Sequence, residues 1–148
     1  MTETSEKKLH CQVVTPDKQV IDKQVHFVVL TTFDGEIGIL PQHAPVLCKL
    51  MPSALRVFEN PDSKPEYLYV GGGFAEVLNN SVTIVAPEAM DINDINPTEL
   101  EEEIKKLADE TDKSIPLEGE ARARALAIAE AKKKVYYSIK EKLKENRN

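Results

Sequence analysis

The chain has 148 residues, 41% of them hydrophobic, which is enough for one domain or for a small domain with an appendage. Its formal net charge of −6 argues against nucleic acid as the main partner, because phosphate binding requires a basic surface. The polar N-terminus MTETSEKK is not followed by an apolar signal core, and no apolar run approaches the roughly 20 residues of a membrane-spanning helix. We therefore expect a soluble chain that reaches a membrane only through a complex.

The first part of the chain, residues 1–89, has the pattern of an all-β domain. Short apolar runs alternate with polar residues and are separated by Pro, Gly, Asn and Asp: LHCQVVT, VHFVVLTT, ALRVFE, EYLYV, FAEVL and SVTIVA. This period-two pattern with frequent turn residues is typical of a sandwich or barrel, and the turn spacing suggests about eight to ten strands. Asn79 and Asn80, which tolerate positive φ, predict a hairpin. No long helical pattern intervenes, so the strands should pair mostly antiparallel.

Residues 90–148 change to a helical pattern and predict an antiparallel two-helix hairpin. The first helix should be capped by Asn96, start at Pro97 and bury a face of Leu100, Ile104 and Leu107. Pro116 and Gly119 break the pattern. The second helix should run from about residue 120 to 143, with a stripe of Ala121, Ala125, Ile128, Val135, Ile139 and Leu143. Because these stripes are thin and rich in alanine, we expect a weakly held hairpin that can detach or extend.

The two helices carry opposite charge. Residues 91–120 hold eleven acidic residues and three lysines, a net charge of −8, whereas residues 121–148 hold nine basic and three acidic residues, a net charge of +6. Exposed ion pairs between such helices contribute on the order of a few tenths of a kcal/mol each. The second helix presents five basic residues as candidate contacts for an acidic partner: Arg122, Arg124, Lys132, Lys133 and Lys134. A solvated basic face is an equally good interpretation of them.

No motif for catalysis or metal binding is present. The chain lacks GxSxG, and His10, His26 and His43 form neither HxH nor HExxH, so they are interpreted as structural or solvent-facing. Cys11 and Cys48 lie in strand-like apolar surroundings and are expected to be free packing thiols. The run GGGFAE at residues 71–76 is not followed by GK[ST] or a helix, and it predicts a bulge or a tight strand crossing instead of a phosphate loop.

The stretch GEIGILPQHAP, residues 35–45, predicts a stiff docking loop. Asp34 and Gly35 signal a turn, Gly38 is expected to let backbones approach closely, and two prolines stiffen the exit. A stiff loop loses little entropy when a partner binds, and Glu36 and His43 would supply its polar contacts.

Three features together resemble one known family. GEIGILPQHAPVL (residues 35–47), VGGGFAEVLNNSVTIVAPEA (residues 70–89) and the acidic-then-basic helical tail are similar to the epsilon subunit of F-type ATP synthases. The resemblance covers nearly the whole chain in the same order. It implies an α+β architecture: a ten-stranded antiparallel β-sandwich followed by a two-helix hairpin.

The resemblance also implies a function without catalysis, cofactor or metal. A family member belongs to the rotating central stalk, docks on the gamma subunit and the membrane-embedded c-ring, and couples ion flow through the ring to ATP synthesis. In bacterial members the helical tail can fold against the sandwich or extend along gamma; when extended it transiently meets the alpha and beta subunits of the catalytic head and blocks rotation in the hydrolysis direction. The subunit is then peripheral, at the cytoplasmic face of the cell inner (plasma) membrane. By position, the c-ring-facing loop is Gly35, Glu36, Ile37 and Gly38, and the gamma-facing segment is His43, Ala44 and Pro45.

One family motif is altered in this chain. Some bacterial members bind ATP through a motif close to [IL]-D-x-x-R-A, whereas this chain has INPTEL, residues 95–100. Ile95 and Leu100 remain, but Asn96 stands for the aspartate and Glu99 for the arginine. A glutamate repels phosphate. We therefore predict weak or no ATP binding.

Two other classes of function remain open. A small β-sandwich enzyme would use His43 or Cys48, and its isolated chain would be active. A free-standing adaptor with a helical arm would be recovered from membranes without gamma or catalytic subunits.

Overall fold

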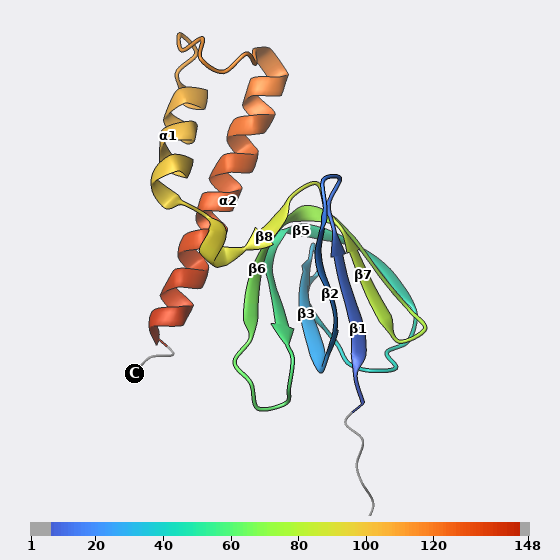
Figure 1. Cartoon of the computed structure of the whole chain (residues 1–148). Helices are drawn as coiled ribbons and strands as arrows, with labels where there is room; N and C mark the ends of the chain where they lie inside the picture. Colours follow the sequence, from blue (N-terminus) through green and yellow to red (C-terminus); the bar gives the residue numbers. More distant parts are fainter. Residues whose placement is uncertain (1–6, 146–148) are drawn as a thin grey trace, which may run out of the picture. The chain divides into compact units, whose positions relative to one another are not determined.

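The computed structural model describes residues 7–145, which divide into two compact units that meet between Met90 and Asp91. Eight strands and two α-helices occur in the described part of the chain (Figure 1). The strands are β1 (Leu9–Val14), β2 (Gln19–Val25), β3 (Phe27–Thr32), β4 (Gly35–Ile39), β5 (Val46–Phe58), β6 (Glu66–Leu78), β7 (Ser81–Val85) and β8 (Ala89–Asp91). A 3₁₀ turn (Ile92–Asp94) precedes α1 (Pro97–Ala108) and α2 (Gly119–Glu145). Neither helix combines the length and the apolar character that crossing a membrane requires.

The strands form one sheet that folds over an apolar core. Their order is β2-β1-β7-β6-β5-β3-β4, with β8 added to β6. All pairs along this order are antiparallel except β1 with β7, which is parallel. The predicted β-sandwich and its mostly antiparallel pairing are confirmed, and β1 with β7 is the one parallel pair along this order. The strand that pairs with β1 on this side is β7, which follows β6 in the chain. It runs in the same direction as β1.

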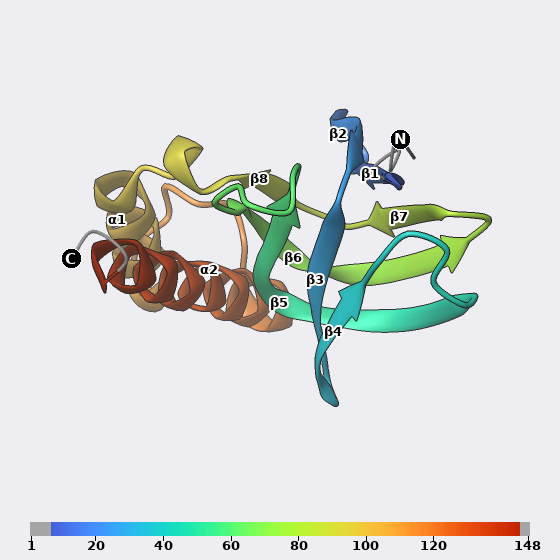
Figure 2. The ribbon, with the colours of Figure 1, turned by 90° about the horizontal axis from the view of Figure 1, so that it is seen from below.

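The strand count is eight instead of the predicted ten, because β5 and β6 each run for 13 residues. Both continue through residues that the sequence pattern marks as strand ends, Pro52 in β5 and Gly71 to Gly73 in β6. The later part of β6 pairs with β7, whereas the later part of β5 pairs with β3. Each long strand therefore serves both layers of the sandwich, and Figure 2 shows their curvature.

Where the long strands bend, the residues that face the core switch between even-numbered and odd-numbered positions. In β6 the core residues are Leu68 and Val70 before the glycines and Ala75 and Val77 after them. Two of the glycines have left-handed backbones, with φ of 91° at Gly72 and 103° at Gly73. A Cβ on Gly73 would lie 2.1 Å from the carbonyl oxygen of Val85. The predicted tight crossing is confirmed: the glycines let β6 approach β7 closely and turn its side chains over.

The predicted hairpin after β6 is also confirmed. Asn79 and Asn80 have φ of 50° and 60° and form the two-residue turn between β6 and β7. Positive φ at both positions matches the twist of the flanking strands, which is why asparagine suits this turn.

The helices pack side by side as a hairpin. Asn96 caps α1 by accepting hydrogen bonds from the backbone N–H groups of Thr98 and Glu99, and Leu100 and Leu107 are buried as expected. The predicted stripe of α2 is wrong in part, since Ala121 is exposed and Ile128 is 55% exposed. The buried line of α2 is Arg122, Ala129, Tyr136 and Ile139. A count of aliphatic residues does not anticipate an arginine and a tyrosine on the inner face.

Gly73→Ala should lower the free energy of unfolding of the sandwich by about 3 kcal/mol, because the methyl group would clash with the Val85 carbonyl and the backbone is left-handed. Urea unfolding followed by circular dichroism measures this change. The matched control is Gly38→Ala, where the added Cβ meets nothing within 4 Å and which should change stability by less than about 1 kcal/mol. Equal effects of the two substitutions would contradict the prediction.

Candidate functional site

The segment Gly35 to Gly38, expected as a loop, is strand β4 at an edge of the sheet. The turn itself lies at Phe33 and Asp34, where the Thr32 hydroxyl donates to the Gly35 carbonyl (2.9 Å) and accepts from the Asp34 N–H (3.1 Å). Gly35 has φ of 119°, so glycine is required there to close the turn. The residues therefore form an edge strand whose outer backbone groups have no neighbouring strand among residues 7–145.

Two details of β4 differ from the sequence analysis. Gly38 does not mediate a close backbone approach, because no atom lies within 4 Å of where its Cβ would be. The Glu36 carboxylate accepts a 2.7 Å bond from Nη2 of Arg56 on β5. Glu36 is thus held in place within the sandwich, although its side chain remains 55% exposed.

His43, Ala44 and Pro45 lie in the connection that follows β4, so the two predicted contact segments stand at opposite ends of that strand. Gln42 has φ of 64°, and its N–H donates to the side-chain oxygen of Asn80 (2.8 Å). The Asn80 amide in turn donates to the Lys8 carbonyl (2.8 Å). One asparagine therefore joins the connection to the β6–β7 turn and to the start of β1, which stiffens the predicted gamma-facing segment.

An apolar outer face lies beside that segment, and the sequence analysis did not identify it. We use this name for four large side chains on β5, β6 and β7 that are 45–70% exposed: Leu47, Phe74, Leu78 and Val85. Strand register places Phe74 directly opposite Val85, and Glu76 opposite Leu47. The outward positions of these strands alternate apolar residues with polar ones such as Lys49 and Glu76, so the sequence pattern alone does not show that the apolar ones gather on one face.

The apolar outer face is hollowed next to Pro45. A shallow groove of about 250 Å³ is lined by Pro45, Val46, Leu47, Glu76, Val77 and Leu78. Lys49 lies two residues after Leu47 on β5, and its ammonium is 5.4 Å from the ring centre of Phe33, which is 62% exposed. Exposed apolar side chains that gather on one face in this way are typical of an interaction surface.

The histidines do not gather into one site. His10 is bonded to Asp22 through Nε2 and lies 3.2 Å from the Ser81 hydroxyl through Nδ1, while Nδ1 of His43 lies 2.7 Å from the Ala44 carbonyl. The Ser81–His10–Asp22 line resembles a catalytic triad in composition, but it lies on an open sheet face with His10 35% exposed. A hydrolase site requires an enclosed pocket with oxyanion donors, which an open face of paired strands does not supply. Among residues 7–145, no group of three or more His, Cys, Asp or Glu side chains is placed to hold a metal ion.

Both cysteines are free thiols with raised pKa values. Burial raises the pKa of Cys11 to about 12, against a smaller opposite effect of Lys23. Burial also raises the pKa of the half-buried Cys48. Since the thiolate is the nucleophile, these shifts disfavour the enzyme interpretation that depends on Cys48.

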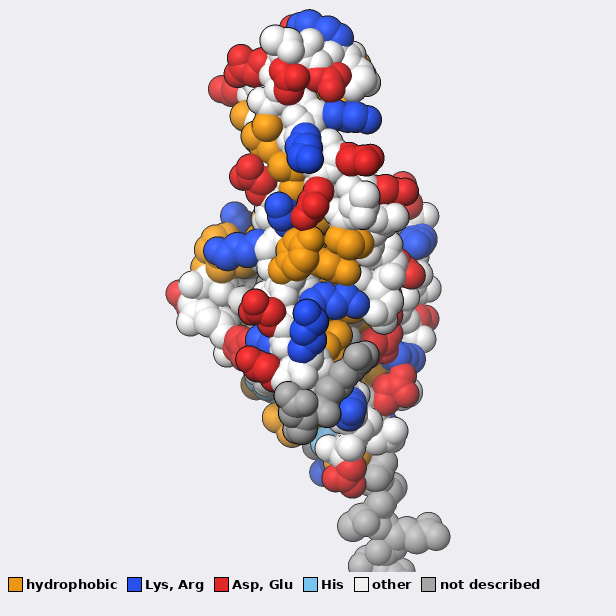
Figure 3. Space-filling view, turned by 90° about the vertical axis from the view of Figure 1, so that its left-hand side faces the viewer, with side chains coloured by type: hydrophobic (Ala, Val, Ile, Leu, Met, Phe, Trp, Pro, Cys, Tyr) orange, Lys and Arg blue, Asp and Glu red, His pale blue; other side chains and the backbone are white. Residues whose placement is uncertain are grey.

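The five predicted basic contacts of the tail do not form one surface. Arg122 is only 6% exposed and its side chain points inward, so it is not available to a partner. Arg124 is exposed and lies 3.7 Å from Glu120, and Lys133 lies 3.8 Å from Glu101 of α1. Lys132 is half-buried, whereas Lys134 is exposed. Figure 3 shows charged side chains of both signs spread over the face that the hairpin presents.

The altered ATP motif forms the start of the hairpin. Ile95 and Leu100 are buried, and the Asn96 side chain is engaged as the cap of α1. Glu99 lines a cavity of about 460 Å³ together with Glu102, Glu103 and Lys106. Three carboxylates against one ammonium would repel a phosphate. Weak or absent ATP binding stays a prediction.

Comparison with known protein families gives a match over most of the first unit. Residues 8–92 match the family model described as ATP synthase, Delta/Epsilon chain, beta-sandwich domain. The ATP synthase epsilon chain of Nitratidesulfovibrio vulgaris (strain DP4) is 43% identical over 91 residues, which cover 62% of this chain and 66%, just under two thirds, of the relative. The epsilon chain of Lactiplantibacillus plantarum is 39% identical over 101 residues, covering 68% of this chain and 71% of the relative.

Solved structures share the fold across nearly the whole chain. A chain of the Euglena gracilis mitochondrial ATP synthase, solved with OSCP, F1 and c-ring, superposes with a TM-score of 0.66 at 22% identity, covering 92% of this chain and 81% of its own. A chain of the central stalk and c-ring of the Tetrahymena thermophila mitochondrial ATP synthase gives a TM-score of 0.55 at 16% identity, covering 93% and 98%. At these identities the likeness shows the fold.

Iodoacetamide at pH 8 should label Cys48 in the native chain and spare Cys11. A pKa of about 12 leaves a thiolate fraction roughly a thousandfold below that of an ordinary thiol, and burial also blocks access. Mass spectrometry of Cys48→Ser, which retains Cys11, and of Cys11→Ala, which retains Cys48, separates the two rates. Urea should abolish the difference. Rapid labelling of native Cys11 would overturn this prediction.

The raised pKa of Cys11 also predicts how stability depends on pH. As pH rises above the ordinary thiol pKa, ionisation of Cys11 favours the unfolded chain, so the free energy of unfolding should fall.

Proposed function

The chain belongs to the ATP synthase delta/epsilon family, and we propose that it is a non-catalytic subunit of the central stalk of an F-type ATP synthase. In this role the sandwich docks on the gamma subunit and on the c-ring and couples ion flow through the ring to ATP synthesis in the catalytic head. The proposal rests on the family match over residues 8–92 together with the apolar outer face.

The apolar outer face carries the proposed contact with gamma. Its four side chains are half to two-thirds exposed in the chain alone. Covering the exposed half of a large aliphatic or aromatic side chain contributes roughly 1 kcal/mol. The groove on the same surface is lined in part by Pro45, which directly follows His43 and Ala44 in the chain. A partner that covers both would combine apolar burial with polar contacts at the connection after β4.

The other end of β4 carries the proposed contact with the c-ring. Gly35, Glu36, Ile37 and Gly38 form an edge strand, and the exposed Phe33 stands at the turn before it. The Glu36–Arg56 bond holds the acidic side chain in a fixed position. Torque transfer requires a body that does not deform, and the shared strands β5 and β6 join the two contact regions in one sheet.

The tail is proposed to contact the alpha and beta subunits through basic side chains of α2 that are exposed or half-buried. After the structural correction at Arg122, the candidates are Arg124, Lys132, Lys133 and Lys134. Such contacts would hinder rotation in the hydrolysis direction. The subunit would lie at the cytoplasmic face of the inner (plasma) membrane and be peripheral to it.

Leu47→Asp should weaken docking, because it removes the most exposed apolar side chain of the apolar outer face and places a second carboxylate there beside Glu76. Membranes stripped of this subunit would be reconstituted with wild-type or variant chain, and bound chain and ion-driven ATP synthesis measured. We expect wild type to restore coupled synthesis and Leu47→Asp to bind at least about tenfold more weakly.

Ile128→Asp is the matched control, since Ile128 is an equally large aliphatic side chain, 55% exposed, on α2. It should bind and restore synthesis like wild type. Circular dichroism of each variant establishes that the fold is retained. Full restoration by Leu47→Asp would contradict the proposed surface, and failure of the wild-type chain to bind would contradict the proposed function.

Truncation before Asn96 tests the tail separately in the assembled complex. Loss of α1 and α2 should raise ATP hydrolysis, because the basic contacts with the head disappear, while coupled synthesis persists through the sandwich. Hydrolysis and ion pumping are measured on the same membranes. Unchanged hydrolysis would show that this tail does not inhibit.

A further inference from the structure

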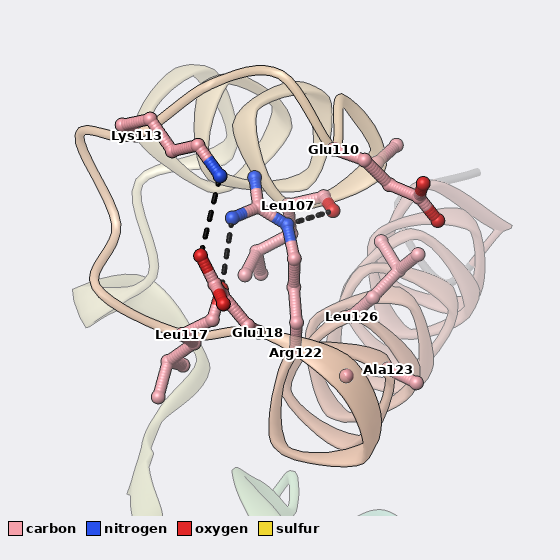
Figure 4. A pocket seen from close by; sticks show the side chains of 10 residues that line it. Leu107, Glu110, Lys113, Leu117, Glu118, Arg122, Ala123 and Leu126 are labelled. Atoms are coloured by element: carbon pink, nitrogen blue, oxygen red, sulfur yellow. Dashed lines mark hydrogen bonds and ion pairs between the residues drawn. The ribbon is translucent and has the colours of Figure 1, made fainter.

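Arg122 is the most heavily bonded side chain described in the helical unit. It is 6% exposed and projects from the first turns of α2 towards the end of α1 (Figure 4). Its Nε donates to the Leu107 carbonyl (2.9 Å), and Nη1 donates to the carbonyls of Leu117 (3.0 Å) and Ile115 (3.5 Å). Its Nη2 donates to the carbonyls of Asp109 (2.7 Å) and Lys106.

These five bonds match the five N–H donors of a guanidinium. Three of the carbonyls belong to the last turn and C-cap of α1, where helix oxygens lack partners within the helix and carry partial negative charge. The other two belong to the segment that connects α1 with α2. The guanidinium of Arg122 on α2 therefore donates hydrogen bonds both to carbonyls at the end of α1 and to carbonyls of the connection.

The other side-chain polar contacts at this closed end stay within the connection and do not join it to either helix. Lys113 and Glu118 form an ion pair of 3.2 Å, but both side chains are more than 70% exposed. Exposed pairs contribute little. The neighbouring cavity of about 450 Å³ is lined by Leu107, Leu117 and Leu126 among others, and it leaves the connection thinly packed apart from Arg122. The Arg122 donors that border the cavity are already used, and Lys113, which also lines it, is paired with Glu118.

We infer that Arg122 pins the closed end of the hairpin, so that α1 and α2 stay paired as one body and do not separate into one extended rod. The five bonds share one rigid guanidinium, and opening the connection breaks them together. Farther from the closed end, Glu101 of α1 accepts from the Tyr137 hydroxyl of α2 (2.8 Å) and lies 3.8 Å from Lys133. These two contacts join the helices at a second place. This inference concerns the hairpin itself and does not depend on the proposed function.

Arg122→Leu in the full chain tests the pin, because it removes all five donors and keeps an apolar stem. We expect amide hydrogen exchange in residues 100–108 and 119–130 to become at least about tenfold faster, while amides of β1 and β7 keep their wild-type rates. Arg122→Lys, which keeps the charge but has three donors, should fall between wild type and Arg122→Leu.

The matched control is Arg124→Leu, an arginine two residues away whose side chain is 79% exposed. Its exchange rates should equal those of wild type. The inference is overturned by unchanged rates in Arg122→Leu, by equal acceleration in Arg124→Leu, or by wild-type helices that already exchange without protection. If Arg122→Leu also loosens the sandwich, the Lys variant decides, and wild-type rates there overturn the inference.

Discussion

The pairing of β5 with β6 is the constraint on which the sandwich depends. The two strands are paired in register from Val46 opposite Val77 to Val57 opposite Glu66, and they form the centre of the sheet: β7 and β8 pair with β6, β3 pairs with β5, and the remaining strands are added outside β7 and β3. That continuity requires a chain that can bend without ending. Three glycines supply the bend in β6, and Gly73 has no room for a side chain against the Val85 carbonyl. A sheet that bends around one core in this way resists shear between its layers, which a subunit that transmits force requires.

The bend also explains where the sequence was informative and where it misled. Period-two patterns at residues 9–14 and 81–85 predicted their strands correctly, and the paired asparagines predicted their turn, because those signals are local. Turn spacing suggested about eight to ten strands and the family resemblance implied ten, whereas β5 and β6 each continue through residues that are typical of strand ends. Continuity through Gly71 to Gly73 is set by pairing with β5, a partner distant in sequence. Likewise, the sequence pattern of neither segment indicates that β1 and β7 pair in parallel.

The functional surface shows a similar division. The motif at residues 35–45 suggested two contact segments by resemblance, and its Asp34–Gly35 turn signal was correct, whereas the expected loop at residues 35–38 is strand β4 and Gly38 mediates no close approach. The apolar outer face escaped notice because each residue occupies an ordinary strand position, and only the register places Phe74 beside Val85 across the sheet. Leaving apolar side chains exposed to water costs free energy, and the core of the sandwich is filled by other aliphatic residues. The four exposed side chains are therefore not part of the core. Their position next to Pro45, in the segment assigned by resemblance, makes the two independent indications coincide on one surface.

Arg122 shows why charge counting cannot assign a surface. In the sequence it is one of nine basic residues that give the tail its positive charge, and its neighbour Arg124 is identical in kind. In the structure one arginine is solvated and the other is enclosed by backbone carbonyls. The difference comes from helical phase: residue 122 faces the end of α1, where carbonyls have no partners, and only a long side chain with several donors can reach them all. Thin alanine-rich stripes suggested a loose hairpin, but a polar anchor at its closed end supplies the cohesion that the apolar stripe lacks. Mobility of the tail, if it regulates the enzyme, then belongs to the hairpin as a unit.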